Sequence, residues 1–168
     1  RGAYVLLPVQ PDKLEVALRS LPVLGFSGCN LTIPHKVAAL DVLDRVDPQA
    51  HRIGAVNTVV VEVDGTLTGM NTDGFGYIQS LLDVRPDWRA DAGPAMVVGA
   101  GGAARAVIVA LMENGAQEIR LTNRSADKAK NMASEFGSMA AIVGASRRVR
   151  SDVAAILRLW PSSPMDSA

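Results

Sequence analysis

The chain has 168 residues, 48% of them hydrophobic, and its 17 Lys and Arg residues balance its 17 Asp and Glu residues. Because these charges balance, no global charge favours binding to nucleic acid or to an anionic membrane, and no apolar run is long enough to cross a bilayer. The single cysteine, Cys29, excludes an internal disulfide and fits the reducing cytoplasm. We therefore expect a cytoplasmic α/β protein. The composition leaves open whether it is a monomer or a homodimer.

The first half of the chain alternates apolar, β-branched runs with segments of helical periodicity. Leu14, Leu18 and Leu21 recur on one face, a spacing typical of an amphipathic helix. The predicted strands are residues 4–9 and 26–33, and the predicted helices are residues 12–21, 34–44 and 48–53. Asp64 and Gly65 then lie between two β-branched runs, a pattern that predicts a β-hairpin.

The stretch G-C-N-L-T-I-P-H-K, residues 28–36, lies where the second predicted strand passes into a helix. Proline suits the first position of a helix, so we expect Pro34 to open this one. The chemistry of α/β proteins gathers beyond the carboxyl ends of strands, which favours a functional role for the Lys36 ammonium. An ordinary exposed lysine at the start of a helix is the alternative.

The segment G-M-N-T-D-G-F-G, residues 69–76, contains three glycines and is predicted to form a loop before a helix at residues 77–82. A polar stretch with two prolines follows at residues 85–94, and such a stretch is typical of a domain boundary. We therefore predict an N-terminal domain at residues 1–85 and a second domain at residues 86–144.

The second predicted domain begins with a buried strand, a glycine-rich turn and a helix. The turn, Gly99-Ala100-Gly101-Gly102-Ala103-Ala104, fits the dinucleotide pattern G-x-G-x-x-G/A. Its first glycine permits a tight turn, its second lets a pyrophosphate approach the backbone, and the helix N-terminus attracts the phosphate charge. A strand at 118–122, a helix at 125–136 and a strand at 140–143 continue the pattern. A glycine-rich turn without a ligand is the alternative.

The end of the strand at 118–122 indicates which nucleotide is bound. An NAD site usually has an acidic residue there, whereas this chain has Asn123, Arg124 and Ser125, with Lys128 one turn later. A guanidinium and an ammonium attract a 2′-phosphate, and the asparagine and serine add hydrogen bonds. These residues favour NADP; the alternative is that Arg124 and Lys128 are solvated surface charges.

Several segments together resemble the shikimate dehydrogenase family. They are N-L-T-I-P-H-K, A-V-N-T, N-T-D-G-F-G, V-V-G-A-G-G-A-A-R-A and T-N-R-S-A-D-K-A, in this order, within about residues 1 to 135. The resemblance implies a two-domain α/β fold, with an N-terminal substrate domain and a Rossmann-like NADP domain around a cleft. It also implies the reduction of 3-dehydroshikimate to shikimate with NADPH, in aromatic amino acid biosynthesis.

The resemblance also implies roles for four residues. Lys36 and Asp73 match the family's catalytic pair, and Thr32 and Asn57 match contacts to substrate hydroxyls. An ammonium stabilises and protonates the oxygen of a ketone as it is reduced, so a lysine suits this reaction. No metal site is predicted.

The chain departs from the family at both ends. Arg1 stands where an initiator Met is usual, and the family's serine-containing turn for the substrate carboxylate is not recognisable. The later N-x-x-P-x-G-M-type turn and the late glutamine are not recognisable either. We expect residues 145–168 to be a divergent tail, either a frameshift product or a genuine end, and we expect the 168-residue chain to be inactive alone.

Two further functions remain open from the sequence. A quinate or quinate/shikimate dehydrogenase shares the same motifs, although Arg124 and Lys128 argue for NADP. A catalytically silent NADP-binding module is an alternative of another class, made less favourable by the retained Lys36 and Asp73.

Overall fold

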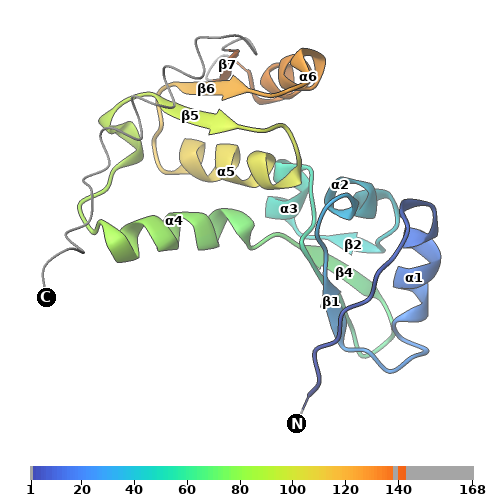
Figure 1. Ribbon diagram of the computed structural model, residues 1–168. Coiled ribbons are helices and arrows are strands. Elements are labelled where there is room, and N and C mark those ends of the chain that lie inside the picture. The colour runs from blue at the N-terminus through green and yellow to red at the C-terminus, as the bar shows by residue number, and fades with distance from the viewer. Residues whose placement is uncertain (1, 138–139, 143–168) are drawn as a thin grey trace, which may run out of the picture.

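The computed structural model describes residues 2–137 and 140–142 (Figure 1). Within these residues the chain forms two β-sheets with helices packed on them, so the predicted α/β class is confirmed. One sheet has four strands of mixed direction, and the other has three parallel strands. The predicted tail at residues 145–168 lies outside the described residues.

The mixed sheet contains β1 (Gly28–Asn30), β2 (Arg45–Val46), β3 (Thr58–Val61) and β4 (Leu67–Met70), in the order β1-β3-β4-β2. Strands β3 and β4 form the predicted hairpin, with Val59 opposite Gly69. Strand β1 pairs antiparallel with β3, whereas β2 pairs parallel with β4. Because Thr58 is opposite Met70, the residues just before β3 lie beside the residues just after β4.

The helices beside the mixed sheet are short: η1 (Pro11–Lys13), α1 (Leu14–Ser20), α2 (His35–Ala38), η2 (Ala39–Asp41) and α3 (Pro48–Ile53). Helix α1 buries Leu14 and Leu18 against the sheet, as its periodicity predicts. Helix α3 has its predicted bounds because the Asp47 carboxylate accepts the Ala50 N–H at 2.6 Å and Pro48 occupies the first turn.

Four predictions for this half are wrong in detail. Residues 4–9 are not a strand, since Pro8 lacks an N–H for a ladder and the flanking side chains are largely exposed. The strand predicted at 26–33 is paired only over Gly28–Asn30. Pro34 precedes α2 instead of opening it, and the helix predicted at 34–44 tightens after Ala38 into the 3-10 turn η2.

The parallel sheet contains β5 (Ala95–Val98), β6 (Ile119–Thr122) and β7 (Ala140–Ile142), with α5 (Gly102–Glu113) and α6 (Ala126–Phe136) between them in the chain. These elements confirm the predicted strand–turn–helix pattern to within a residue or two. The fully buried Ile108, Ile119 and Leu121 lie at the centre of the core that joins α5 and α6 to the strands.

Helix α4 (Asp73–Val84) lies beside α5, opposite the parallel sheet (Figure 1). It begins at Asp73, four residues earlier than predicted. Gly74 lies within the helix instead of the predicted loop, and it allows α4 to pack closely against α5. A Cβ on Gly74 would be 3.0 Å from the Ala106 carbonyl oxygen. The 3-10 turn η3 (Ala90–Ala92) follows, and the domain division near residues 85–94 stays a prediction. None of the described helices is long and apolar enough to cross a membrane.

Candidate functional site

An ion pair joins α2 to the start of α4. Lys36 Nζ lies 2.6 Å from Asp73 Oδ2, and the two side chains are only 15% and 26% exposed. The two residues are 37 positions apart in the sequence, and the mixed sheet brings them together because the segment after β4 passes beside α2. A partly buried ammonium beside a carboxylate is a group able to give a proton to a bound oxygen.

Asn57 completes this cluster from the loop before β3. Its Nδ2 donates to Asp73 Oδ1 at 2.7 Å and to Thr72 Oγ1 at 3.1 Å. Its Oδ1 accepts from the Thr72 N–H at 3.0 Å and from Thr58 Oγ1 at 2.8 Å. The Asn57 carboxamide is buried, and both its oxygen and its nitrogen form hydrogen bonds. Asp73 therefore accepts from Asn57 at Oδ1 and from Lys36 at Oδ2.

Asn71 is a further member that the sequence analysis did not single out. Its Nδ2 donates to the Ala55 carbonyl at 2.8 Å, and its Oδ1 accepts the Asp73 N–H at 3.0 Å. The side chain is buried, and it ties the backbone of Asp73 to the segment before Asn57. The signal was present in N-T-D, because asparagine commonly accepts the N–H two residues later.

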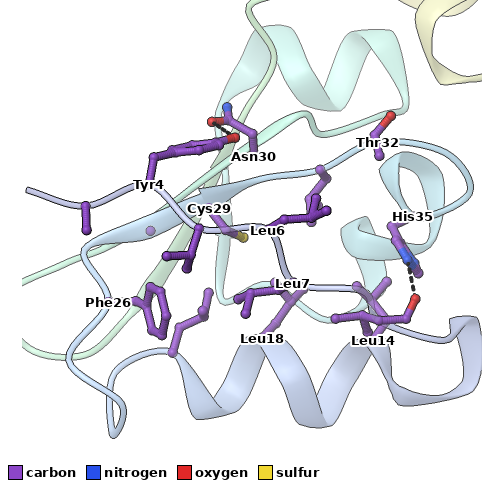
Figure 2. A pocket seen from close by; sticks show the side chains of 16 residues that line it. Tyr4, Leu6, Leu7, Leu14, Leu18, Phe26, Cys29, Asn30, Thr32 and His35 are labelled. Carbon is purple, nitrogen blue, oxygen red and sulfur yellow. Dashed lines mark hydrogen bonds between the residues drawn. The ribbon is translucent and has the colours of Figure 1, made fainter.

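Thr32 lies apart from this cluster. Its side chain is exposed, and within the described residues it makes no hydrogen bond to Lys36, Asp73 or Asn57. It lines a separate cavity of about 170 Å³ beneath the extended N-terminal segment, where Figure 2 shows it at the rim with Asn30. The structure therefore brings together three of the four residues that the resemblance groups.

The cavity beside Thr32 is mostly apolar. Leu14 and Leu18 of α1 line it from one side, and Leu6 and Leu7 cover it from the N-terminal segment (Figure 2). Burial raises the pKa of the Cys29 thiol, so this side chain stays protonated near neutral pH.

Two hydrogen bonds hold the N-terminal segment over this cavity. The Tyr4 hydroxyl donates to Asn30 Oδ1 at 3.2 Å, and His35 Nε2 lies 3.0 Å from the Val9 carbonyl. Asn30 also donates from Nδ2 to Thr58 Oγ1 at 3.2 Å, so the cavity rim is linked to the polar cluster.

The glycine-rich turn faces Lys36. Gly99 has φ +127°, a conformation that other residues rarely adopt, and Gly101 caps α5 with open space around it. A Cβ on Gly102 would be 2.9 Å from Lys36 Cβ, so this position admits only glycine at the present spacing. Packing against Lys36 is a reason for Gly102 that the phosphate pattern did not reveal.

A cavity of about 430 Å³ lies between the turn and Lys36. Its lining includes Ala100, Gly101 and Gly102 from the turn, together with Lys36 and Lys128. The first N–H groups of α5, including that of Ala103, have no side-chain cap. Backbone donors and two ammonium groups therefore border the same space, and the Glu135 carboxylate in its wall is paired with Arg105. This arrangement suits an anionic ligand.

The predicted 2′-phosphate residues follow β6. Asn123 donates from Nδ2 to the Ser125 carbonyl at 3.0 Å and so shapes the turn into α6. Arg124, Ser125 and Lys128 are exposed, and neither cation forms an ion pair with the described residues. In the described part of the chain, no three His, Cys, Asp or Glu side chains are grouped to hold a metal ion.

Comparisons with known proteins match both halves of the chain. A family model described as the shikimate dehydrogenase substrate binding domain matches residues 1–59, and one described as shikimate / quinate 5-dehydrogenase matches residues 88–154. A protein of Paramagnetospirillum magneticum named shikimate dehydrogenase (NADP(+)) is 49% identical over 89% of this chain and 54% of its own length. The chain thus spans about half the length of the curated relatives it matches.

Solved structures give the same result. Shikimate dehydrogenase from Aquifex aeolicus matches with a TM-score of 0.75 and 37% identity, over 86% of this chain and 52% of that one. Shikimate 5-dehydrogenase from Thermus thermophilus, in complex with NADP(H) and shikimate, matches with a TM-score of 0.69 and 41% identity. That match covers 83% of this chain and 55% of the Thermus chain.

Proposed function

The chain belongs to the shikimate dehydrogenase family, and on this premise we propose that the protein reduces 3-dehydroshikimate to shikimate with NADPH. One observation supports the proposal above the others. Lys36, which pairs with Asp73, also lines the cavity bordered by the glycine-rich turn. The proton donor and the dinucleotide loop therefore share one space, as a ketone reduction requires.

NADPH supplies the hydride that is added to the carbonyl carbon of the substrate. We assign to Lys36 the proton that the carbonyl oxygen takes as negative charge develops on it. Asp73 holds the ammonium at 2.6 Å and so fixes the direction of the Nζ protons. After turnover, Lys36 regains a proton from water through its exposed fraction.

Asn57 and Thr32 are proposed to contact the hydroxyl groups of the substrate. Asn57 already makes hydrogen bonds to Thr58, Thr72 and Asp73, so a substrate hydroxyl replaces one of these partners. Thr32 is exposed and free to turn its hydroxyl toward a ligand. A polar site of this kind discriminates against rings that lack the matching hydroxyl.

The residues of the nucleotide half fit NADP. Gly99, Ala100, Gly101, Gly102 and Ala103 present backbone donors at the start of α5, with no side chain over Gly101. Asn123, Arg124, Ser125 and Lys128 are proposed to bind the ribose 2′-phosphate. The absence of an acidic residue in residues 123–125 disfavours NAD, and with it the quinate alternative.

The domain division at residues 85–94, the cytoplasmic location and the choice between monomer and homodimer belong to the same proposal. The polar composition of residues 85–94 and the single Cys29 support the first two.

The test measures NADPH oxidation with 3-dehydroshikimate, using the 168-residue chain and, separately, any longer reading frame that contains it. Quinate with NADP and NAD is assayed in the reverse direction, and Lys36→Met is the control. Turnover of 3-dehydroshikimate that Lys36→Met abolishes supports the proposal. NADPH binding without turnover in both samples contradicts the proposed reductase function and supports the alternative of a catalytically silent NADP-binding module.

A further inference from the structure

Arg105, on the first turn of α5, connects α3, beside the mixed sheet, with α6, beside the parallel sheet. Its Nη1 donates to the Ile53 carbonyl at the end of α3, at 3.3 Å. Its Nη2 forms an ion pair with Glu135 of α6, and its guanidinium lies 5.8 Å from the centre of the Phe136 ring. The Arg105 side chain is only 16% exposed, whereas that of Glu135 is 49% exposed, so the bond to Ile53 is better shielded from water than the ion pair.

The surroundings of Arg105 are built around this contact. Gly54 caps α3 with φ +70°, and a Cβ there would lie 2.6 Å from Arg105 Nη1. Beneath the guanidinium, Ile53 and Ala55 from the mixed-sheet half pack against Ala106 and Val109 of α5. The contact therefore lies on an apolar junction between the two halves of the molecule.

Arg105 also stands one helical turn from the glycine that touches Lys36. Gly102 and Arg105 are three residues apart on α5, so they lie on the same face of the helix. Gly102 packs against Lys36, and Arg105 donates a hydrogen bond to the Ile53 carbonyl at the end of α3. Helix α5, and the dinucleotide turn at its start, are thus held against the mixed-sheet half at two points.

We propose that Arg105 is a positioning residue that fixes the dinucleotide turn at the correct distance from Lys36. This inference rests on the proposed function, since it concerns the spacing between the hydride and the proton donor. Small displacements of reacting groups have large effects on rate, so loss of the contact slows hydride transfer while both ligands still bind.

A direct contact between Arg105 and a cofactor phosphate is the competing explanation. Arg105 lines the 430 Å³ cavity, but its Nη1 donates to Ile53 and its Nη2 to Glu135. Lys128 lines the same cavity without an ion-pair partner in the described residues. The phosphate is therefore better assigned to Lys128, and the two explanations differ in what they predict for NADPH affinity.

The experiment compares Arg105→Gln with Arg52→Gln. Arg52 is the matched control because its Nη1 lies 3.1 Å from Glu113 Oε1 and joins the same two helices, α3 and α5, at an exposed edge. Glu135→Gln is a milder second variant, because it removes the ion pair but keeps the bond from Arg105 to Ile53. It keeps the proposal testable if Arg105→Gln does not fold.

Two readouts are measured on each variant. The first is the distance distribution between spin labels at Val23→Cys and Lys130→Cys, both exposed, in a Cys29→Ala background. The second is the single-turnover rate of NADPH oxidation, with its deuterium isotope effect and the Kd for NADPH. The label distances need no substrate, so they test the contact even if the proposed function fails.

Arg105→Gln is expected to broaden the label distances and to slow hydride transfer by about tenfold to a hundredfold, with the Kd for NADPH unchanged. Glu135→Gln is expected to show a smaller change of the same kind, and Arg52→Gln none. Unchanged label distances in Arg105→Gln overturn the proposal, and so does broadening without a slower hydride step. A weakened Kd for NADPH with unchanged distances establishes the phosphate contact instead. Absence of turnover in both the unsubstituted 168-residue chain and a longer reading frame that contains it contradicts the proposed function separately.

Discussion

The Lys36 cluster and the nucleotide-binding residues differ in how far their polar groups are already paired. Lys36, Asp73 and Asn57 are joined to one another by hydrogen bonds of 2.6 to 2.7 Å. By contrast, Arg124 and Lys128 are exposed and make no ion pair with the described residues. The first region is organised by the protein itself, whereas the second offers unpaired cations and backbone donors that a ligand completes.

Replacing Lys36 tests the paired region most severely. Lys36→Met is expected to lower turnover by about 10³-fold, because the proton donor is lost, while NADPH affinity is retained. Steady-state kinetics and NADPH fluorescence titration measure the two effects. Far-UV circular dichroism controls for folding. Turnover within tenfold of the unsubstituted protein would contradict the assignment of the proton to Lys36.

Substitutions at Gly102 and Gly101, at the border of the two regions, distinguish a role in packing from a role in letting the ligand approach the backbone. Gly102→Ala places a methyl group against Lys36 and is expected to cost about 1–3 kcal/mol of the free energy of unfolding, measured by urea denaturation. Gly101→Ala is the matched control, because no atom of the described residues lies within 4 Å of the added Cβ. It is expected to spare stability and weaken NADPH binding. Equal stabilities of the two variants would refute the packing role of Gly102.

The unpaired cations are tested through cofactor preference. Arg124→Ala and Lys128→Ala are each expected to weaken NADPH binding by about tenfold to a hundredfold, since each loses a charge-assisted hydrogen bond. NADH binding is expected to change little. Lys130→Ala, an exposed lysine on the same helix, is the control. If the affinity for NADH fell as much as the affinity for NADPH, the two cations would not bind the 2′-phosphate.

The smallest expected effect concerns the scaffold beneath the paired region. The Leu67 N–H at 2.8 Å and the Arg19 guanidinium at 2.6 Å hold the pKa of Asp44 below its ordinary value of 3.8. A carboxylate with a depressed folded-state pKa stabilises the fold above its ordinary pKa, and this stability is lost as pH falls through the folded value. Asp44→Asn should therefore lower the free energy of unfolding at pH 7 but not in strong acid.

Urea denaturation from pH 7 down to pH 2 measures this difference. Asp12→Asn is the control, because among the described residues the Asp12 carboxylate pairs only with its exposed neighbour Lys13, at 3.1 Å, and such pairs contribute little. A difference between Asp44→Asn and the unsubstituted protein that stays constant with pH would contradict the proposed role of the carboxylate.

The sequence by itself determined the local elements and the kinds of residue at the site. The hairpin at Asp64-Gly65, the bounds of α3 and the turn before α5 follow from local chemistry, since turn residues, caps and glycines act on their near neighbours. Lys36, Asp73 and Asn57 stand out in the sequence through their motifs, and their chemical suitability for a ketone reduction follows from their side chains alone.

Tertiary structure decided what depends on contacts between distant segments. Thr32 is separated from the Lys36 cluster, and Asn71 joins it, because the path of the chain after β1 and β4 sets both positions. Gly74 lies in a helix, since α5 packs against it closely, and Gly102 is required by Lys36, 66 residues earlier in the sequence. Arg105 has no local signal, because its partners lie 52 and 30 residues away. Sequence periodicity reports which face of an element is buried, but only the packed fold determines what lies against that face.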